Sequence, residues 1–136
     1  MKYTGIVVGA LISIIGTVVL TLVFGAAMSA SSTTPADVEG DFGVGLGAAV
    51  LSATARVLGG ATAGLMARRT RSMAWTVGAG SAAGLLAFLV MFLLGVLANT
   101  AAGETLASAE DIAAFFLWTL EGALGGWLAW LLRGRR

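Results

Sequence analysis

Four long apolar stretches, separated by short polar segments, make up most of the chain. They cover about residues 4–28, 42–67, 73–98 and 112–132. A helix rises about 1.5 Å per residue, so about 20 apolar residues cross the hydrocarbon core of a bilayer, which is about 30 Å thick. The pattern predicts an all-α membrane protein with four transmembrane helices in an up-down-up-down bundle, forming a single transmembrane domain over residues 1–136.

The polar segments between these stretches predict the connections. Residues 29–41 and 99–111 are rich in small polar and acidic residues, and the first contains the only proline, Pro35, as is typical of loops. We expect both to be outer loops and residues 68–72 to form a tight cytoplasmic turn. Ser108, three residues before Asp111, resembles a helix N-cap before the fourth stretch.

The first stretch has a second interpretation, as a cleaved signal peptide. Lys2 would be its basic start, and the small residues at 27–30 would form the cleavage site. Signal peptides carry an apolar segment of only about 7–15 residues, and this stretch is much longer. We therefore expect an uncleaved helix.

Composition agrees with a membrane protein and narrows its chemistry. Hydrophobic residues make up 58% of the chain and charged residues 11%, whereas soluble domains carry roughly 25% charged residues. The chain has no Cys and no His, which removes thiol nucleophiles and the commonest metal ligands and proton shuttles. The membrane Ser and Thr residues have no recognisable base beside them. We expect no enzymatic activity, no cofactor and no metal.

All but two of the charges separate by side if the four stretches cross in alternating directions. The basic face then carries Lys2, Arg68, Arg69, Arg71, Arg133, Arg135 and Arg136, and the acidic face carries Asp37, Glu39, Asp41, Glu104, Glu110 and Asp111. Because cytoplasmic segments of membrane proteins are enriched in Lys and Arg, this pattern predicts a multi-pass plasma-membrane protein with both termini in the cytoplasm.

Arg56 and Glu121 are the two charges inside apolar stretches. Arg56 lies 12 residues before Arg68, and Glu121 lies 12 residues before Arg133. Both therefore lie about 18 Å from the basic face, near the middle of the bilayer. A charge at that depth is costly and needs a partner, so we expect the two residues to form a midplane charge pair.

Three interpretations of this pair stay open. The first is structural: a buried ion pair that fixes which helices meet and in what register. The second is functional, a proton, ion or anion site in a transporter or channel, because intramembrane charges often mark pathways. In the third, the pair forms between chains, with Arg56 meeting Glu121 of another copy or a charged residue of a different subunit.

Small residues line the predicted helix contacts. The neighbours of Arg56 at helical spacing are all small, including Ala49, Ser52, Gly60 and Ala63. Such residues let transmembrane helices approach closely. Every stretch also carries a GxxxG pair, and together these are Gly5/Gly9, Gly43/Gly47, Gly60/Gly64, Gly80/Gly84 and Gly122/Gly126. They predict tight helix packing, within one chain or between chains.

The two halves of the chain look alike. Residues 7–25 compare with residues 76–95, and residues 56–69 compare with residues 121–136. Two helices per half would make a tandem repeat about an axis along the membrane normal. Arg56 and Glu121 would then occupy equivalent positions.

The segments LGGATAGLMARR at 58–69 and VGAGSAAGLL at 77–86 resemble those of small glycine-rich four-span prokaryotic membrane proteins of unknown function. Two other four-span families differ from the chain. Small multidrug exporters use a Glu in the first helix, where this chain has no acid. The GGxxGAxxR element of small fluoride channels is similar to GGATAGLMARR at 59–69, but here it lies in the second stretch, so no residue roles follow from either family.

These observations favour a small integral membrane protein without enzymatic chemistry. We expect an accessory or scaffold subunit, or a homo-oligomer packed through glycine-rich helix faces, with itself or a larger membrane complex as partner and no nucleic acid. One alternative is a small transporter or channel that uses Arg56 and Glu121. Another is a holin-like pore former, which the size and the basic tail favour.

Overall fold

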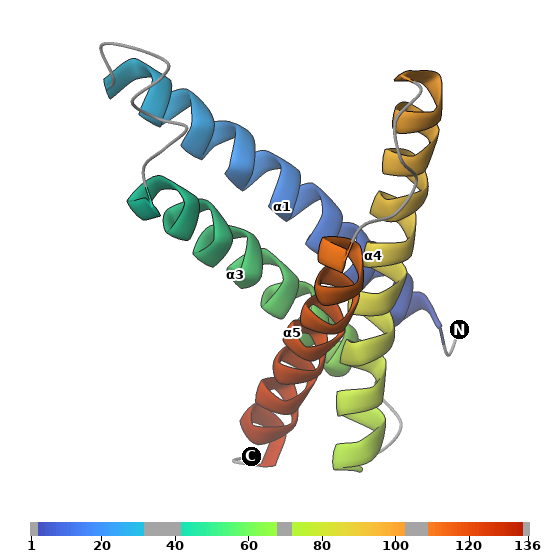
Figure 1. Ribbon diagram of the computed structural model, residues 1–136. Helices are drawn as coiled ribbons and strands as arrows, with labels where there is room; N and C mark the ends of the chain where they lie inside the picture. Colours follow the sequence, from blue (N-terminus) through green and yellow to red (C-terminus); the bar gives the residue numbers. More distant parts are fainter. Residues whose placement is uncertain (1–2, 32–41, 68–71, 103–108, 135–136) are drawn as a thin grey trace.

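The computed structural model describes residues 3–31, 42–67, 72–102 and 109–134. Over these ranges the chain is helical (Figure 1). The helices are α1 (Thr4–Ser31), α3 (Phe42–Met66), α4 (Met73–Ala102) and α5 (Ala109–Gly134). Each is long and apolar enough to cross a membrane. The predicted all-helical class and the four membrane-spanning stretches are therefore confirmed, and the chain has the character of a multi-pass membrane protein.

The helices extend past the apolar stretches at several ends. Helix α1 continues to Ser31, α4 continues to Ala102, and α5 begins at Ala109. The length of an apolar stretch reflects the thickness of the bilayer. Small residues such as Ala and Ser allow the helix to continue beyond that stretch. Ser108, the predicted N-cap, lies outside the described residues, although Ala109 directly after it begins α5.

Helices α1 and α3 form one antiparallel pair. A methyl group built on Gly5 would lie 2.9 Å from Cβ of Met66, and one built on Gly16 would lie 2.9 Å from Cβ of Ala55. Numbers rise along α1 as they fall along α3, so the two helices run in opposite directions. Backbones this close require small residues on both helices, which dispersion and weak hydrogen bonds then hold together.

Helices α4 and α5 form the second antiparallel pair. The backbone of Gly84 meets that of Trp118, and the backbone of Gly80 meets that of Gly122. Helices α3 and α5 also pack against each other, and they run in the same direction, because Gly60 meets Gly125 and Gly64 meets Ala129.

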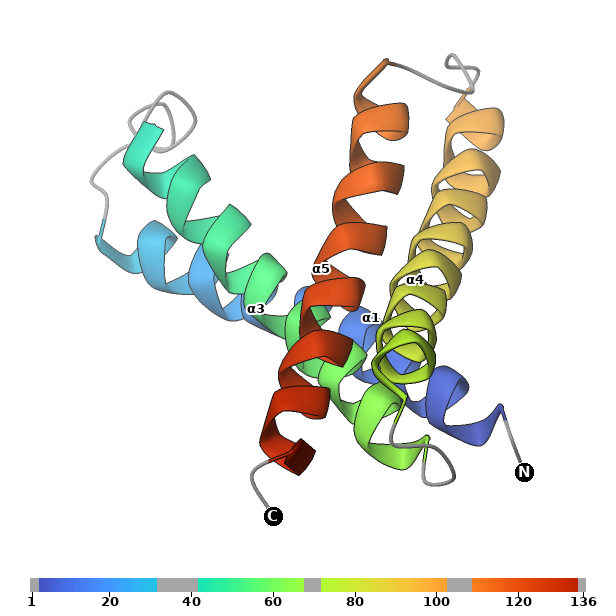
Figure 2. The same cartoon turned by 90° about the horizontal axis from the view of Figure 1, so that it is seen from below.

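The two pairs cross instead of lying parallel (Figure 2). They converge where α1 begins and where α3 and α5 end, and they diverge towards the opposite ends. Residues 32–41 and 103–108, which connect the diverging ends, carry acidic residues in the sequence, and the basic residues follow or precede the converging ends. We call the converging end the basic end and the diverging end the acidic end, after the charged residues that lie next to these helix ends in the sequence.

Small side chains form most of the core. Among the described residues, the buried apolar ones are Ala10, Ala55, Ala63, Ala79, Ala83, Ala87, Ala129 and a single large one, Phe88. Large aliphatic residues of α3, such as Leu46 and Leu58, are more than half exposed. In a bilayer these side chains meet lipid, which is as apolar as they are.

Most Ser and Thr hydroxyls of the helices form hydrogen bonds within their own helix. The side chains of Ser13, Ser52, Thr54, Thr62 and Thr119 each donate to the carbonyl oxygen four residues earlier. This bonding satisfies a polar group inside an apolar helix. The Ser52 hydroxyl also lies 3.4 Å from that of Thr21 on α1. Thr17 differs, because its hydroxyl is buried with no hydrogen-bond partner among the described residues.

Candidate functional site: a charge pair where the helix pairs cross

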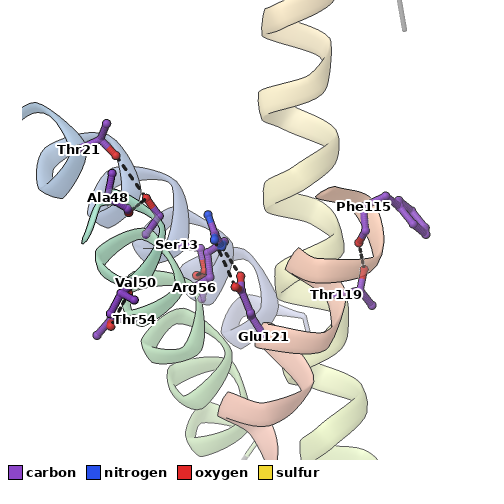
Figure 3. A network of polar contacts seen from close by, with 11 residues as sticks. Ser13, Thr21, Ala48, Val50, Thr54, Arg56, Phe115, Thr119 and Glu121 are labelled. Atoms are coloured by element: carbon purple, nitrogen blue, oxygen red, sulfur yellow. Dashed lines mark hydrogen bonds and ion pairs between the residues drawn. The ribbon is translucent and has the colours of Figure 1, made fainter. Parts of the chain in front are cut away.

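The structure brings Arg56 of α3 and Glu121 of α5 together as an ion pair within one chain (Figure 3). Nε of Arg56 donates to Oε2 of Glu121, and Nη2 donates to Oε1 over 3.3 Å. This is the two-pronged arrangement that suits a guanidinium and a carboxylate. Only 8% of the Arg56 side chain and 11% of the Glu121 side chain are exposed, so the pair is shielded by protein.

Trp118 adds a third contact to the pair. The guanidinium carbon of Arg56 lies 4.7 Å from the centroid of the Trp118 ring, within the range of a cation–π interaction. The Trp118 ring in turn packs edge-on against Phe88, and so does Phe115. A guanidinium between a carboxylate and an aromatic face has its charge balanced without water.

Sequence reasoning missed this role of Trp118. Trp118 lies three residues before Glu121, so the two side chains share a face of α5. That spacing is the signal that could have indicated an aromatic partner for the arginine. The spacing does not show how α3 packs against α5, and that packing decides where the guanidinium lies.

A seam of glycines lies directly beside the pair. A methyl group built on Gly60 would overlap the carbonyl oxygen of Gly122, and one built on Gly125 would overlap that of Val57. One built on Gly64 would lie 3.0 Å from Cβ of Ala129. The α3 and α5 backbones are therefore in contact from the charge pair towards the basic end, which leaves no room for larger side chains at these positions.

The remaining predicted glycines also meet helices of the same chain. Gly5 and Gly9 face α3, while Gly80 and Gly84 face α5 at Gly122, Gly126 and Trp118. Gly47 is covered by the Phe24 ring of α1. Gly43 lies in α3, but its packing lies outside what the structure describes. Packing within the chain thus uses the glycine faces that the sequence also left open to packing between chains.

Arg133 forms a second polar contact between α5 and α3, which sequence reasoning missed. Its Nη2 donates to the carbonyl oxygen of Leu65, and its Nη1 donates to that of Ala67 over 3.4 Å. The last carbonyls of a helix have no partner within the helix and carry partial negative charge. Arg133 therefore caps the C-terminus of α3 and ties the two parallel helices together at the basic end.

The charge pair lies close to the point where the helix pairs begin to diverge. Beyond it, towards the acidic end, α5 diverges from α3 (Figure 2). Ala49, which continues the small-residue stripe of Arg56 in the preceding turns of α3, is exposed. The stripe that the sequence predicts to face protein is covered from Arg56 to Ala63 and open at Ala49.

No family model, curated protein or solved structure matches this chain. Within the described ranges, no group of three or more His, Cys, Asp or Glu residues could hold a metal ion. The buried ion pair of the described residues is therefore the candidate site: one arginine and one carboxylate beside one indole ring, inside an apolar helix contact.

Proposed function

We propose that this chain is a non-enzymatic integral membrane protein, an accessory or scaffold subunit, in which the Arg56–Glu121 pair fastens two helical hairpins to each other. The observation that carries the proposal is the position of the pair, buried at the contact between α3 and α5 and flanked by glycines whose backbones touch. Neither ion is left uncompensated, because both carboxylate oxygens accept from Arg56 and the guanidinium also faces Trp118.

The proposal includes an orientation and a partner class. The positive-inside pattern favours an up-down-up-down path through the plasma membrane with both termini in the cytoplasm. Every described glycine of the GxxxG pairs contacts another helix of the same chain, so a second copy or a larger complex would bind the exposed aliphatic faces of the helices. At the acidic end the separation of the hairpins offers such faces on α3 and α5.

A second candidate function is a small transporter or channel, and one observation favours it. The pair lies near the open side of the crossing, so a change in the angle between the hairpins would expose it towards the acidic end. An arginine and a carboxylate that separate and re-form would then act as an ion or proton site.

A set of charge variants separates the two candidates. Removal of one member of a buried ion pair leaves an uncompensated charge and costs about 3–5 kcal/mol, whereas replacement of both by apolar residues is often neutral. We therefore expect Arg56→Ala and Glu121→Ala to lower the unfolding free energy in mild detergent, and Arg56→Met combined with Glu121→Leu to restore most of it. The swap of Arg56→Glu with Glu121→Arg should restore part, because Trp118 would then face a carboxylate.

The readouts are unfolding in detergent and ion or proton flux in vesicles. If the charge pair has only a structural role, the apolar double variant should fold like the unchanged protein, and neither protein should carry ion or proton flux. Flux in the unchanged protein that the stable double variant lacks would replace our proposal with the transport function. Single variants as stable as the unchanged protein would contradict the fastening role.

A further inference from the structure

Thr17 of α1 carries a buried hydroxyl that the described part of the chain does not satisfy. Its oxygen has no hydrogen-bond partner among the described residues. Thr54 and Thr62 of α3 show the usual arrangement, in which the hydroxyl donates to the carbonyl oxygen four residues earlier. A buried hydroxyl that has lost water and gained no partner lowers stability. Such a group therefore indicates a further polar atom beside it, most often that of an ordered water.

Thr17 lies level with Arg56 across the contact between α1 and α3. The Thr21 hydroxyl of α1 lies 3.4 Å from the Ser52 hydroxyl of α3 (Figure 3). Thr17 lies four residues before Thr21, and such residues share a face of a helix. Arg56 lies four residues after Ser52. Because the two helices are antiparallel, Thr17 and Arg56 form the corresponding pair one turn nearer the basic end.

A second contact between α1 and α3 gives the same level independently. A methyl group built on Gly16 would lie 2.9 Å from Cβ of Ala55. Gly16 and Ala55 directly precede Thr17 and Arg56 in the chain. With a rise of about 1.5 Å per residue in opposite directions, Thr17 and Arg56 begin within about 3 Å of the same height.

Arg56 has hydrogen-bond donors that Glu121 does not use. A guanidinium carries donors on each of its nitrogens, and the bonds to Glu121 come from Nε and Nη2. Among the described residues no hydrogen bond from Nη1 is formed. The side chain is buried, so these N–H groups need an acceptor within the protein interior.

The neighbouring hydroxyls do not provide that acceptor. Ser13 donates to the carbonyl oxygen of Gly9, back along α1. Ser52 donates to the carbonyl oxygen of Ala48, back along α3. Thr17 does not bond back in this way, so the carbonyl oxygen of Ser13, four residues before it, keeps a lone pair that no side chain uses. An unused donor, an unused hydroxyl and an unused carbonyl lone pair thus lie at one level.

We propose that an ordered water molecule binds between Thr17 and Arg56 and joins α1 to the charge pair. The water accepts from Nη1 of Arg56 and from the Thr17 hydroxyl, and it donates to the carbonyl oxygen of Ser13. About three polar partners are typical of a buried water. The site favours a neutral molecule over an anion, because Glu121 already compensates the charge of Arg56. The inference goes beyond the proposed function, since the water binds in the same way whether the pair fastens helices or carries ions.

Thr17→Val tests the site, because valine keeps the shape of threonine and removes the hydroxyl. Thr54→Val is the matched control, since the Thr54 hydroxyl is exposed and bonds within its own helix. Unfolding in mild detergent is measured for both variants in two backgrounds. One is the unchanged protein, and the other is Arg56→Met/Glu121→Leu, which lacks the guanidinium that binds the water.

We expect Thr17→Val to raise the unfolding equilibrium constant about tenfold in the unchanged protein, because hydrogen bonds to charged groups contribute most to stability. In Arg56→Met/Glu121→Leu the same substitution should leave that constant unchanged or lower it. Thr54→Val should have little effect in either background. A hydroxyl that binds nothing predicts the opposite sign, since its removal would stabilise the unchanged protein. That result, or an equal loss of stability in both backgrounds, would overturn the proposal.

Solid-state NMR detects the water directly and does not depend on stability. The full chain with isotope-labelled arginine is reconstituted into phosphatidylcholine bilayers, and magnetisation is transferred from water to the arginine side chains. The Arg56 signal is the one that Arg56→Met/Glu121→Leu lacks. We expect rapid transfer to Arg56 in the unchanged protein and in Thr17→Ser, which keeps the hydroxyl, and clearly slower transfer in Thr17→Val. Transfer that is equally fast in Thr17→Val, or absent in the unchanged protein, would contradict the assigned site.

Discussion

At the scale of single residues, Arg56 is balanced by two different kinds of partner. Glu121 compensates its charge, and Trp118 covers the guanidinium at 4.7 Å from the ring centroid. A cation over an indole face gains about 0.5–2 kcal/mol, more when water is excluded. The aromatic ring therefore helps to keep an arginine inside the membrane and does more than fill space.

This contribution can be measured by comparing Trp118→Leu in two backgrounds. In the unchanged protein the substitution removes the cation–π contact and the packing against Phe88. In the Arg56→Met/Glu121→Leu background it removes the packing alone. We expect the loss of unfolding free energy to be about 0.5–2 kcal/mol larger in the unchanged protein. Equal losses in the two backgrounds would show that Trp118 acts only through packing.

The sequence predicted the residues of this site better than its contacts. Two equal 12-residue spacings placed Arg56 and Glu121 at the same depth, and small neighbours indicated the faces that meet. Trp118 and Arg133 gained their roles from tertiary geometry. Arg133 was assigned to the basic face by its sign, and only the packing of α5 on α3 shows that it caps the carbonyls of Leu65 and Ala67.

At the scale of elements, the contact between α3 and α5 follows a regular register. Residue numbers that differ by 65 meet across it, as in Arg56 with Glu121, Gly60 with Gly125 and Gly64 with Ala129. The predicted tandem repeat pairs Arg56 with Glu121 at this same offset. The outer helices depart from that symmetry, because α4 packs against both α3 and α5, whereas α1 packs against α3 and α4. The repeat therefore stays a prediction.

Gly122 lies between two other helices, because it meets α3 at Gly60 and α4 at Gly80. A methyl group on Gly122 would overlap the carbonyl oxygen of Gly80, which cannot move without the α4 backbone. We expect Gly122→Ala to lower the unfolding free energy in detergent by about 1–3 kcal/mol, the usual cost of overpacking.

Gly95→Ala is the control for that measurement, because its added methyl group meets open space on α4. It should leave stability unchanged or raise it by up to about 1 kcal/mol through helix propensity. If Gly122→Ala were as stable as Gly95→Ala, the backbones at the seam would be further apart than the structure places them.

At the scale of the whole molecule, the crossing of the hairpins is the feature that the sequence predicted least. Helix number and the four apolar stretches follow from hydropathy, because bilayer thickness fixes the length of a spanning segment. The angle between hairpins depends on which small residues meet. Those contacts are concentrated in the stretch from the Arg56–Glu121 pair to Arg133, at the basic end. Towards the acidic end, Ala49 on the small-residue stripe of α3 is exposed. Hydropathy and residue spacing do not encode that uneven distribution.

The divergence towards the acidic end can be measured in a bilayer, because the chain has no Cys and accepts spin labels at chosen sites. One labelled pair, Leu46→Cys with Ile112→Cys, joins the diverging ends of α3 and α5. The other, Leu65→Cys with Leu132→Cys, joins their converging ends. All four side chains are exposed, so the labels should not disturb packing.

We expect electron–electron resonance to give a clearly longer distance for Leu46→Cys/Ile112→Cys than for Leu65→Cys/Leu132→Cys. The backbones touch near the second pair and lean apart at the first (Figure 2).

The same two distances can be measured in the Arg56→Met/Glu121→Leu double variant, which lacks the charge pair. If the charge pair sets the angle between the hairpins, the first distance should change and the second, which Arg133 and the glycine seam maintain, should not. Equal distances for the two pairs would mean that the hairpins lie parallel in the bilayer, and the opening at the acidic end would then be absent.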